Sequence, residues 1–220
     1  MNKNKIISNK IINTVNLLLG LVLVFSVLSN VVFAYSNDTG WKGYAVYRDG
    51  VITVPGNSSG LNDHAALMDE ESYNDYKPVL HAPGYGDVVE WGTWNEFLDG
   101  NSFLGVYRPR GTTITETEAR RFVSKARQLR GISYTFLDQI NYDPATAETW
   151  VDSDEIFRLR CDGVVEYVYE WYGYRVGGAD GRWDITRNRL ENYWEHLGFN
   201  ITPRKQNRSL LYKVQSSLPW

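Results

Sequence analysis

The sequence is poor in the residues that cross-link chains or bind metals. It has one cysteine and three histidines in 220 residues. A single cysteine cannot form a disulfide within the chain, which excludes a disulfide-stabilised miniprotein. The sequence also lacks zinc-ligand spacings, a Gly-rich phosphate-binding loop and a Gly-x-Ser-x-Gly motif. We therefore expect no cofactor and no bound metal.

Acidic residues are missing from the first 34 positions, where three lysines precede an apolar run from Leu17 to Leu28. Small residues follow and end at Ala34. This order is typical of a secretory signal peptide, so we expect cleavage near Ala34 and a secreted protein. The remaining residues, 35–220, are expected to form one domain, which contacts a membrane only through an uncleaved signal.

Positive charge is scarce in that domain. Removing the three N-terminal lysines lowers the formal net charge from −3 to −6. A chain of this charge is a poor partner for nucleic acid, so no nucleic-acid partner is expected. The sequence does not predict an oligomeric state.

Hydrophobic periodicity predicts strands in the first half of the domain and helices in the second. Thr93–Glu96 and Thr115–Glu118 match the capping box that begins a helix. A helix with Cys161 in its first turn is expected to end at Gly173, and another to span Leu190–Leu197. The expected strands are Gly43–Arg48 and Val51–Val54, joined by a hairpin turn at Asp49–Gly50, then His64–Met68, Pro78–Ala82, Asp87–Trp91 and Phe103–Tyr107. Strands followed by helices predict an α+β domain.

The lone cysteine, Cys161, is either core filler or a nucleophile. A thiol nucleophile needs a lowered pKa, a histidine that takes its proton, and a polar group that orients the histidine. A helix start could supply the first requirement for Cys161. Strand alternation places His64 on one face with Ala66 and Met68, and His81 on one face with Val79, so these histidines could supply the other two. The alternative is that both are hydrogen-bonded strand residues.

The order of these segments resembles a known family. A strand with His-Ala-Ala-Leu at 64–67 precedes an apolar strand ending in His-Ala at 81–82, and Arg-Cys-Asp-Gly-Val-Val begins a helix at Arg160. This is similar to the circularly permuted branch of the NlpC-type papain-like superfamily, the YiiX-like cysteine hydrolases, over Tyr44–Gly198. The resemblance implies a permuted papain-like domain, with an antiparallel sheet or small barrel packed against helices.

The resemblance also implies roles for three residues. Cys161 would be the nucleophile, His64 the general base and His81 the orienting group. Relatives often carry serine after the cysteine, where this chain has Asp162, whose charge opposes a neighbouring thiolate.

The resemblance favours a secreted hydrolase or amidase that cleaves cell-wall peptide through a thioester. A lipid acyltransferase or thioesterase on the same fold is an alternative, with an acyl substrate. A non-catalytic wall-binding module is another. Its binding surface would be an aromatic platform of Trp91, Trp94, Tyr73, Tyr76 and Tyr85.

Three further features have ordinary interpretations. His196 beside Glu195 is typical of a cation at a helix end. The acidic stretch 138–155 could be a solvated loop, a calcium site or a flap near the cysteine. The basic run of Arg204, Lys205 and Arg208 is typical of a solvated face.

Overall fold

The computed structural model describes residues 40–53, 60–71, 76–143, 145, 150–177 and 194–219. The chain divides into two units, Met1–Ser36 and Asn37–Trp220. The predicted signal peptide and most of the predicted helix at Leu190–Leu197 lie outside the described residues. Within the described part of the chain, no helix is both long enough and apolar enough to cross a bilayer.

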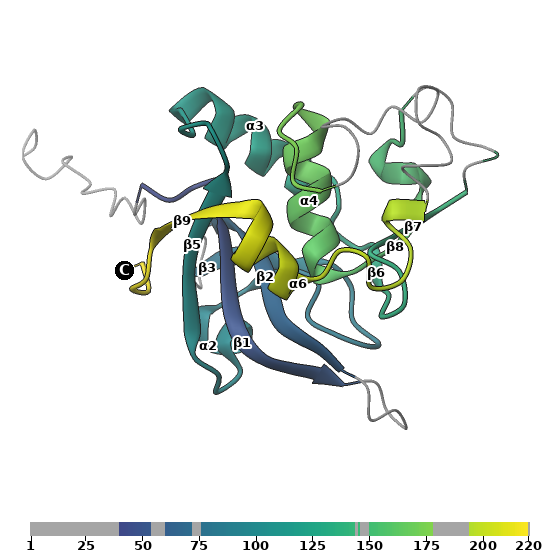
Figure 1. The fold of residues 1–220 in the computed structure, drawn as a ribbon, viewed down its shortest axis with the longest axis horizontal. Helices are drawn as coiled ribbons and strands as arrows, with labels where there is room; N and C mark the ends of the chain where they lie inside the picture. The colour runs from purple at the N-terminus through teal and green to yellow at the C-terminus, as the bar shows by residue number, and fades with distance from the viewer. Residues whose placement is uncertain are drawn as a thin grey trace, which may run out of the picture. The chain divides into compact units, whose positions relative to one another are not determined.

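A six-stranded sheet forms the centre of the second unit (Figure 1). Every pair of neighbouring strands in it is antiparallel. The spatial order is β4 (Glu90–Gly92), β3 (Lys77–His81), β2 (Gly60–Glu71), β1 (Ala45–Thr53), β5 (Phe103–Pro109) and β9 (Leu211–Gln215). The strands expected at His64–Met68, Pro78–Ala82 and Asp87–Trp91 thus overlap β2, β3 and β4, which pair antiparallel in chain order.

The predicted hairpin turn at Asp49–Gly50 is wrong, because both residues lie inside β1. Arg48 pairs with His64 and Val51 pairs with Asn62, so β1 contains one more residue than β2 over this interval. Gly50 has φ +106°, a conformation that a glycine adopts readily. The Asp-Gly pair thus forms a bulge, which uses the same residue types as a two-residue turn.

Two capping boxes begin helices as predicted. Thr93 caps α2 (Trp94–Leu98), and Thr115 caps α3 (Glu116–Arg127). Each threonine hydroxyl accepts a hydrogen bond from the third residue of its helix, and the glutamate there accepts one from the threonine N–H. These reciprocal bonds satisfy backbone donors that a helix start would otherwise leave unpaired.

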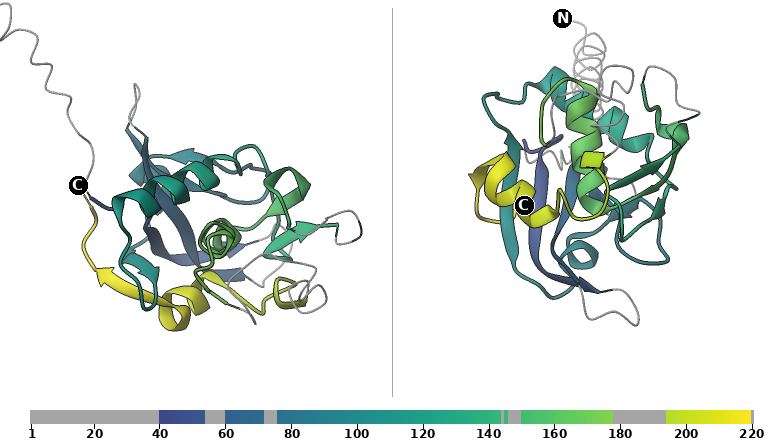
Figure 2. Two further views of the ribbon diagram at one scale, coloured as in Figure 1. Left: turned by 90° about the horizontal axis from the view of Figure 1, so that it is seen from above. Right: turned by 45° about the vertical axis from the view of Figure 1, so that its right-hand side comes forward.

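Helices cover both faces of the sheet. Residues of α3 and of α4 (Cys161–Trp171) pack with Ala45, Tyr47 and Ala65 in one cluster, and α4 is seen almost end-on in the left view of Figure 2. Trp94 and Phe97 of α2 pack with Val46 and Ala66 in the other cluster. Neighbouring strand residues thus face opposite layers, as the period of two requires.

A second, three-stranded sheet leads into α4. Its order is β6 (Ser133–Tyr134), β8 (Ile156–Leu159) and β7 (Ile140–Tyr142). The prediction of an irregular stretch at 138–155 missed β7 and the 3-10 turn η1 (Ser153–Glu155). Because β8 ends at Leu159 and α4 begins at Cys161, this sheet fixes where the helix starts.

The C-terminal residues return to the large sheet, which the sequence did not predict. A short helix, α6 (Pro203–Lys205), continues as a π-helical turn, η2 (Gln206–Leu210). Strand β9 then pairs with β5. The structure is α+β, with a mostly antiparallel sheet packed against helices, which confirms the predicted fold class at that level.

Candidate active site

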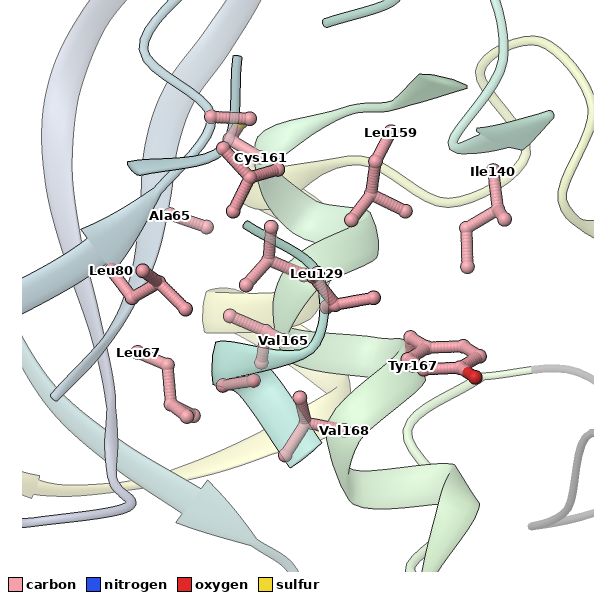
Figure 3. Packing of buried hydrophobic residues seen from close by; sticks show 14 of the residues in the cluster. Ala65, Leu67, Leu80, Leu129, Ile140, Leu159, Cys161, Val165, Tyr167 and Val168 are labelled. Carbon is pink, nitrogen blue, oxygen red and sulfur yellow. The ribbon is translucent and has the colours of Figure 1, made fainter. Parts of the chain in front are cut away.

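Cys161 is the first residue of α4, as predicted, and its side chain is fully buried. It belongs to the cluster on the α4 face of the sheet, which includes Ala65 and Leu159 (Figure 3). The backbone N–H of Ala65 donates a hydrogen bond to the Cys161 sulfur. The thiol therefore lies against strand β2, beside the residue that follows His64.

His64 and His81 are brought together by strands β2 and β3. Nε2 of His64 lies 2.9 Å from Nδ1 of His81, and both rings contact Phe97 of α2. Both side chains are almost completely buried. The predicted alternation is correct, since His64 lies on the face of Ala66, opposite the face of Ala65.

The structure does not bring the thiol and the imidazole into a hydrogen bond. Nδ1 of His64 is buried and has no hydrogen-bond partner among the described residues. Cys161 packs on the α4 face, whereas the two imidazoles contact α2 on the other face. The two histidines are thus paired with each other on one face of β2, whereas the sulfur accepts a hydrogen bond from the backbone on the other face.

The electrostatics favour neutral groups at all three positions. Burial, followed by the neighbouring Asp162 carboxylate, raises the pKa of the Cys161 thiol to about 12. Burial, His81 and the Arg48 guanidinium hold the pKa of His64 well below its usual value. Burial and Arg48 lower the pKa of His81 to about 4. The expected lowering of the thiol pKa by the helix start is wrong, because burial outweighs it.

Asp162 forms a buried ion pair with the residue before the cysteine. Nε and Nη2 of Arg160 lie 2.7 and 2.9 Å from the two carboxylate oxygens of Asp162. The guanidinium also donates to the carbonyl oxygens of Gly198 and Ile201. Asp162 therefore anchors Arg160, which joins the start of α4 to the C-terminal segment.

A second polar cluster, which the sequence analysis missed, lies further along α4. Nε2 of His196 is 3.1 Å from Oε1 of Glu166, and both residues are buried. Glu170 lies one helical turn after Glu166, and one ligand atom from each of these three residues lies within 4.8 Å of the others. His196 is therefore not an exposed residue at a helix end, because its ring faces the interior and Glu166. The i, i+4 spacing of the glutamates was the available signal.

The predicted aromatic platform is not assembled. Trp94 is a core residue, and the guanidinium of Arg130 lies 3.6 Å from the centre of the Trp91 ring. Tyr76 packs against the same cluster as Trp94, whereas Tyr85 is exposed. Tyr73 lies outside the described residues.

The described residues of the acidic stretch and of the basic run make specific contacts. Among the described residues, the side chains close enough to share a metal ion are Glu166, Glu170 and His196, and none of them belongs to the stretch 138–155. In this stretch, Oδ1 of Asp152 forms an ion pair with Nζ of Lys125 at 3.9 Å. Lys205 and Arg208 are exposed, as predicted, whereas Arg204 pairs with Asp63 at 3.0 Å. The three basic residues line a surface pocket of about 340 Å³ with Phe199.

Comparison with protein-family models, curated proteins and solved structures finds no match to this chain. The functional argument therefore depends on the residues themselves.

Proposed function

We propose that the protein is a cysteine-dependent hydrolase of the permuted NlpC-type papain-like superfamily, acting on an amide in cell-wall peptide. Cys161 is the nucleophile, His64 the general base and His81 the positioning residue. The proposal depends on the hydrogen bond between His64 Nε2 and His81 Nδ1. The other ring nitrogen of His64, Nδ1, has no partner among the described residues. The next residue in the strand, Ala65, contacts the thiol.

The histidine pair supports one assignment of protons. If His64 Nδ1 is to accept a proton, its other nitrogen, Nε2, carries hydrogen and donates it to Nδ1 of His81. His81 then stabilises the imidazolium that forms on His64, as the third member of a triad does. Its role is to orient His64, without contact to the substrate.

The pKa values favour attack from neutral groups. A thiol with a pKa of about 12 is protonated at pH 7, and the lowered pKa values keep both imidazoles neutral. In the proposed mechanism the thiol and the imidazole, which lie on opposite faces of β2, first come into contact. The proton then passes from Sγ to His64 Nδ1 while sulfur attacks the carbonyl carbon, as in general-base catalysis. This differs from a preformed thiolate–imidazolium pair.

The remaining steps follow from the same groups. The backbone N–H of Cys161 at the helix start can stabilise the oxyanion. His64 returns its proton to the leaving amine, which leaves a thioester on Cys161. Water, deprotonated by His64, then attacks the thioester, releases the acid and restores the thiol. Because the thiol is fully buried, side chains around it must move before a substrate reaches it.

The test measures product release from purified wall fragments and from p-nitrophenyl acyl esters. Wild type is compared with Cys161→Ala, His64→Ala and the exposed control Tyr85→Ala. We expect Cys161→Ala and His64→Ala to lose at least 100-fold of the rate, and Tyr85→Ala to retain it. Hydrolysis by Cys161→Ala at the wild-type rate would overturn the proposal. Turnover of the acyl esters alone would redirect it to the acyltransferase or thioesterase alternative.

A non-catalytic module is the second candidate, because Cys161 is completely buried and its pKa is raised. A core cysteine has both properties. This candidate predicts that Cys161→Ala binds purified wall as well as wild type does, with no product released by either protein.

A further inference from the structure

We infer that Glu166, Glu170, His196 and Gln139 form a binding site for one divalent metal ion, and that Zn²⁺ fits their chemistry. The site does not depend on the proposed hydrolase function. It lies on α4, one to three helical turns after Cys161, and connects this helix to two other segments of the chain.

The three charged or basic ligands are close enough to share an ion. One donor atom from each of Glu166, Glu170 and His196 lies within 4.8 Å of the others. Ligand atoms that bind one zinc ion at about 2.0–2.2 Å are themselves separated by roughly 3–4 Å, so small movements complete the site. All three residues are at most 2% exposed.

The buried side chain of Gln139 is a fourth potential ligand of the metal ion. Its side chain is completely buried, and its Oε1 atom has no hydrogen-bond partner among the described residues. The Nε2 atom of the same amide lies 2.6 Å from Oε2 of Glu166, which places the unpartnered oxygen at the cluster. A buried carbonyl oxygen without a donor is costly, and a metal ion would satisfy it.

Surrounding groups already hold the carboxylates in place. Oε2 of Glu166 accepts hydrogen bonds from Gln139 and from Gln206, at 2.6 and 2.9 Å. Oε1 of Glu170 accepts two from the backbone N–H groups of Val176 and Gly177, both at 3.1 Å. Amide donors that anchor one oxygen of a carboxylate are typical of the groups that orient metal ligands.

The donor set selects the type of metal. One imidazole, two carboxylates and an amide oxygen give a mixed nitrogen and oxygen site, which suits Zn²⁺ better than Ca²⁺. Two charges on the ion balance the two buried carboxylates. Four protein ligands in a buried site are typical of a structural metal, without an open position for substrate.

Metal binding fixes the tautomer of His196. Nε2 of His196 faces Oε1 of Glu166 at 3.1 Å. The ion takes the Nε2 lone pair and one oxygen of each glutamate, so a neutral ring binds it with its single hydrogen on Nδ1. Bonds to the ion then replace the contact between His196 and Glu166.

The first experiment uses the Cys161→Ser protein, which has no thiol to bind metal. After treatment with EDTA and dialysis, Co²⁺ and Zn²⁺ are titrated in turn. We expect one equivalent of Zn²⁺ per chain, visible absorption bands of four-coordinate Co²⁺ that Zn²⁺ abolishes, and a higher melting temperature with metal. Absence of stoichiometric binding would overturn the inference.

The second experiment assigns the ligands. Glu166→Gln and His196→Ala should each weaken Zn²⁺ binding at least tenfold, whereas the exposed control Glu90→Gln should bind as the parent does. His196→Cys should add a sulfur-to-cobalt charge-transfer band, which arises only if residue 196 touches the metal. Circular dichroism identifies a variant that has not folded. Equal binding by folded Glu166→Gln and the parent, or a folded His196→Cys without the new band, would overturn the assignment.

Discussion

Nε2 of His64 lies 2.9 Å from Nδ1 of His81, and this hydrogen bond joins neighbouring strands on the face of the sheet that α2 covers. Gly92 on the third strand, β4, leaves room for the His81 ring. A Cβ atom at position 92 would lie 2.6 Å from Nε2 of His81. The pair therefore depends on a residue without a side chain.

Gly92→Ala should displace the His81 ring and break its bond to His64. Overpacking of this kind costs about 1–3 kcal/mol of the unfolding free energy, measured by urea denaturation. The ring nitrogen shifts of His64 in NMR spectra should also change. Gly84→Ala is the matched control, because its added Cβ would meet its nearest atom at 3.8 Å. Unchanged His64 shifts in Gly92→Ala would contradict this role of Gly92.

The thiol of Cys161 should react slowly with iodoacetamide at neutral pH. Because its pKa is raised to about 12, the folded protein contains little thiolate until the pH approaches that value. The rate should rise about tenfold per pH unit from pH 7 to pH 10, whereas protein unfolded in urea should level off above about pH 8.5. A plateau below pH 8 in the folded protein would indicate a thiolate–imidazolium pair and contradict the neutral resting state.

The two histidines should make the fold less stable in mild acid. Their pKa values are lowered in the folded state, so the unfolded chain binds more protons below its own histidine pKa of about 6.5. Stability is therefore fully present above about pH 6.5 and is lost as the pH falls toward 4. The unfolding free energy should fall by about 1 kcal/mol per pH unit for each histidine.

Urea denaturation at pH 7 and pH 5 measures this effect. His81→Gln removes one titrating group, so its stability should depend less on pH than that of wild type. An equal pH dependence in the two proteins would show that His81 does not titrate in this range.

Asp162→Asn should destabilise the protein strongly. It leaves the Arg160 guanidinium buried without its carboxylate, which costs about 3–5 kcal/mol of the unfolding free energy. Replacing both residues, with Arg160→Met and Asp162→Leu, should cost less than Asp162→Asn alone. Urea denaturation of both variants tests this, with the exposed pair Arg120 and Glu116 as the control, where Glu116→Gln should cost less than about 1 kcal/mol.

Local sequence patterns predicted much of the fold. Both capping boxes begin helices, because the threonine and the glutamate that form each box are close in the chain. Alternation placed His64 and Ala66 on one face for the same reason. The Asp49–Gly50 bulge was misread as a turn, since the choice between them depends on pairing with a distant part of the chain.

The site was less predictable, because it depends on contacts between distant segments. The sequence indicated that Cys161 begins a helix, but the side of the sheet on which this helix packs is decided by the whole core. The charge of Glu166 alone favours a surface position, yet amides from Gln139 and Gln206 allow it to be buried. Only the tertiary structure brings these donors to it.

Strand β9 has a consequence for the order in which the protein can fold. It pairs with β5, where Val106 lies opposite Gln215, so the edge of the large sheet is completed by a strand that comes much later in the chain. During synthesis, β5 leaves the ribosome long before its partner and presents an unpaired edge until Leu211–Gln215 are made. Such an edge can pair with another chain. Rapid capture of β9 would then protect newly made molecules from aggregation.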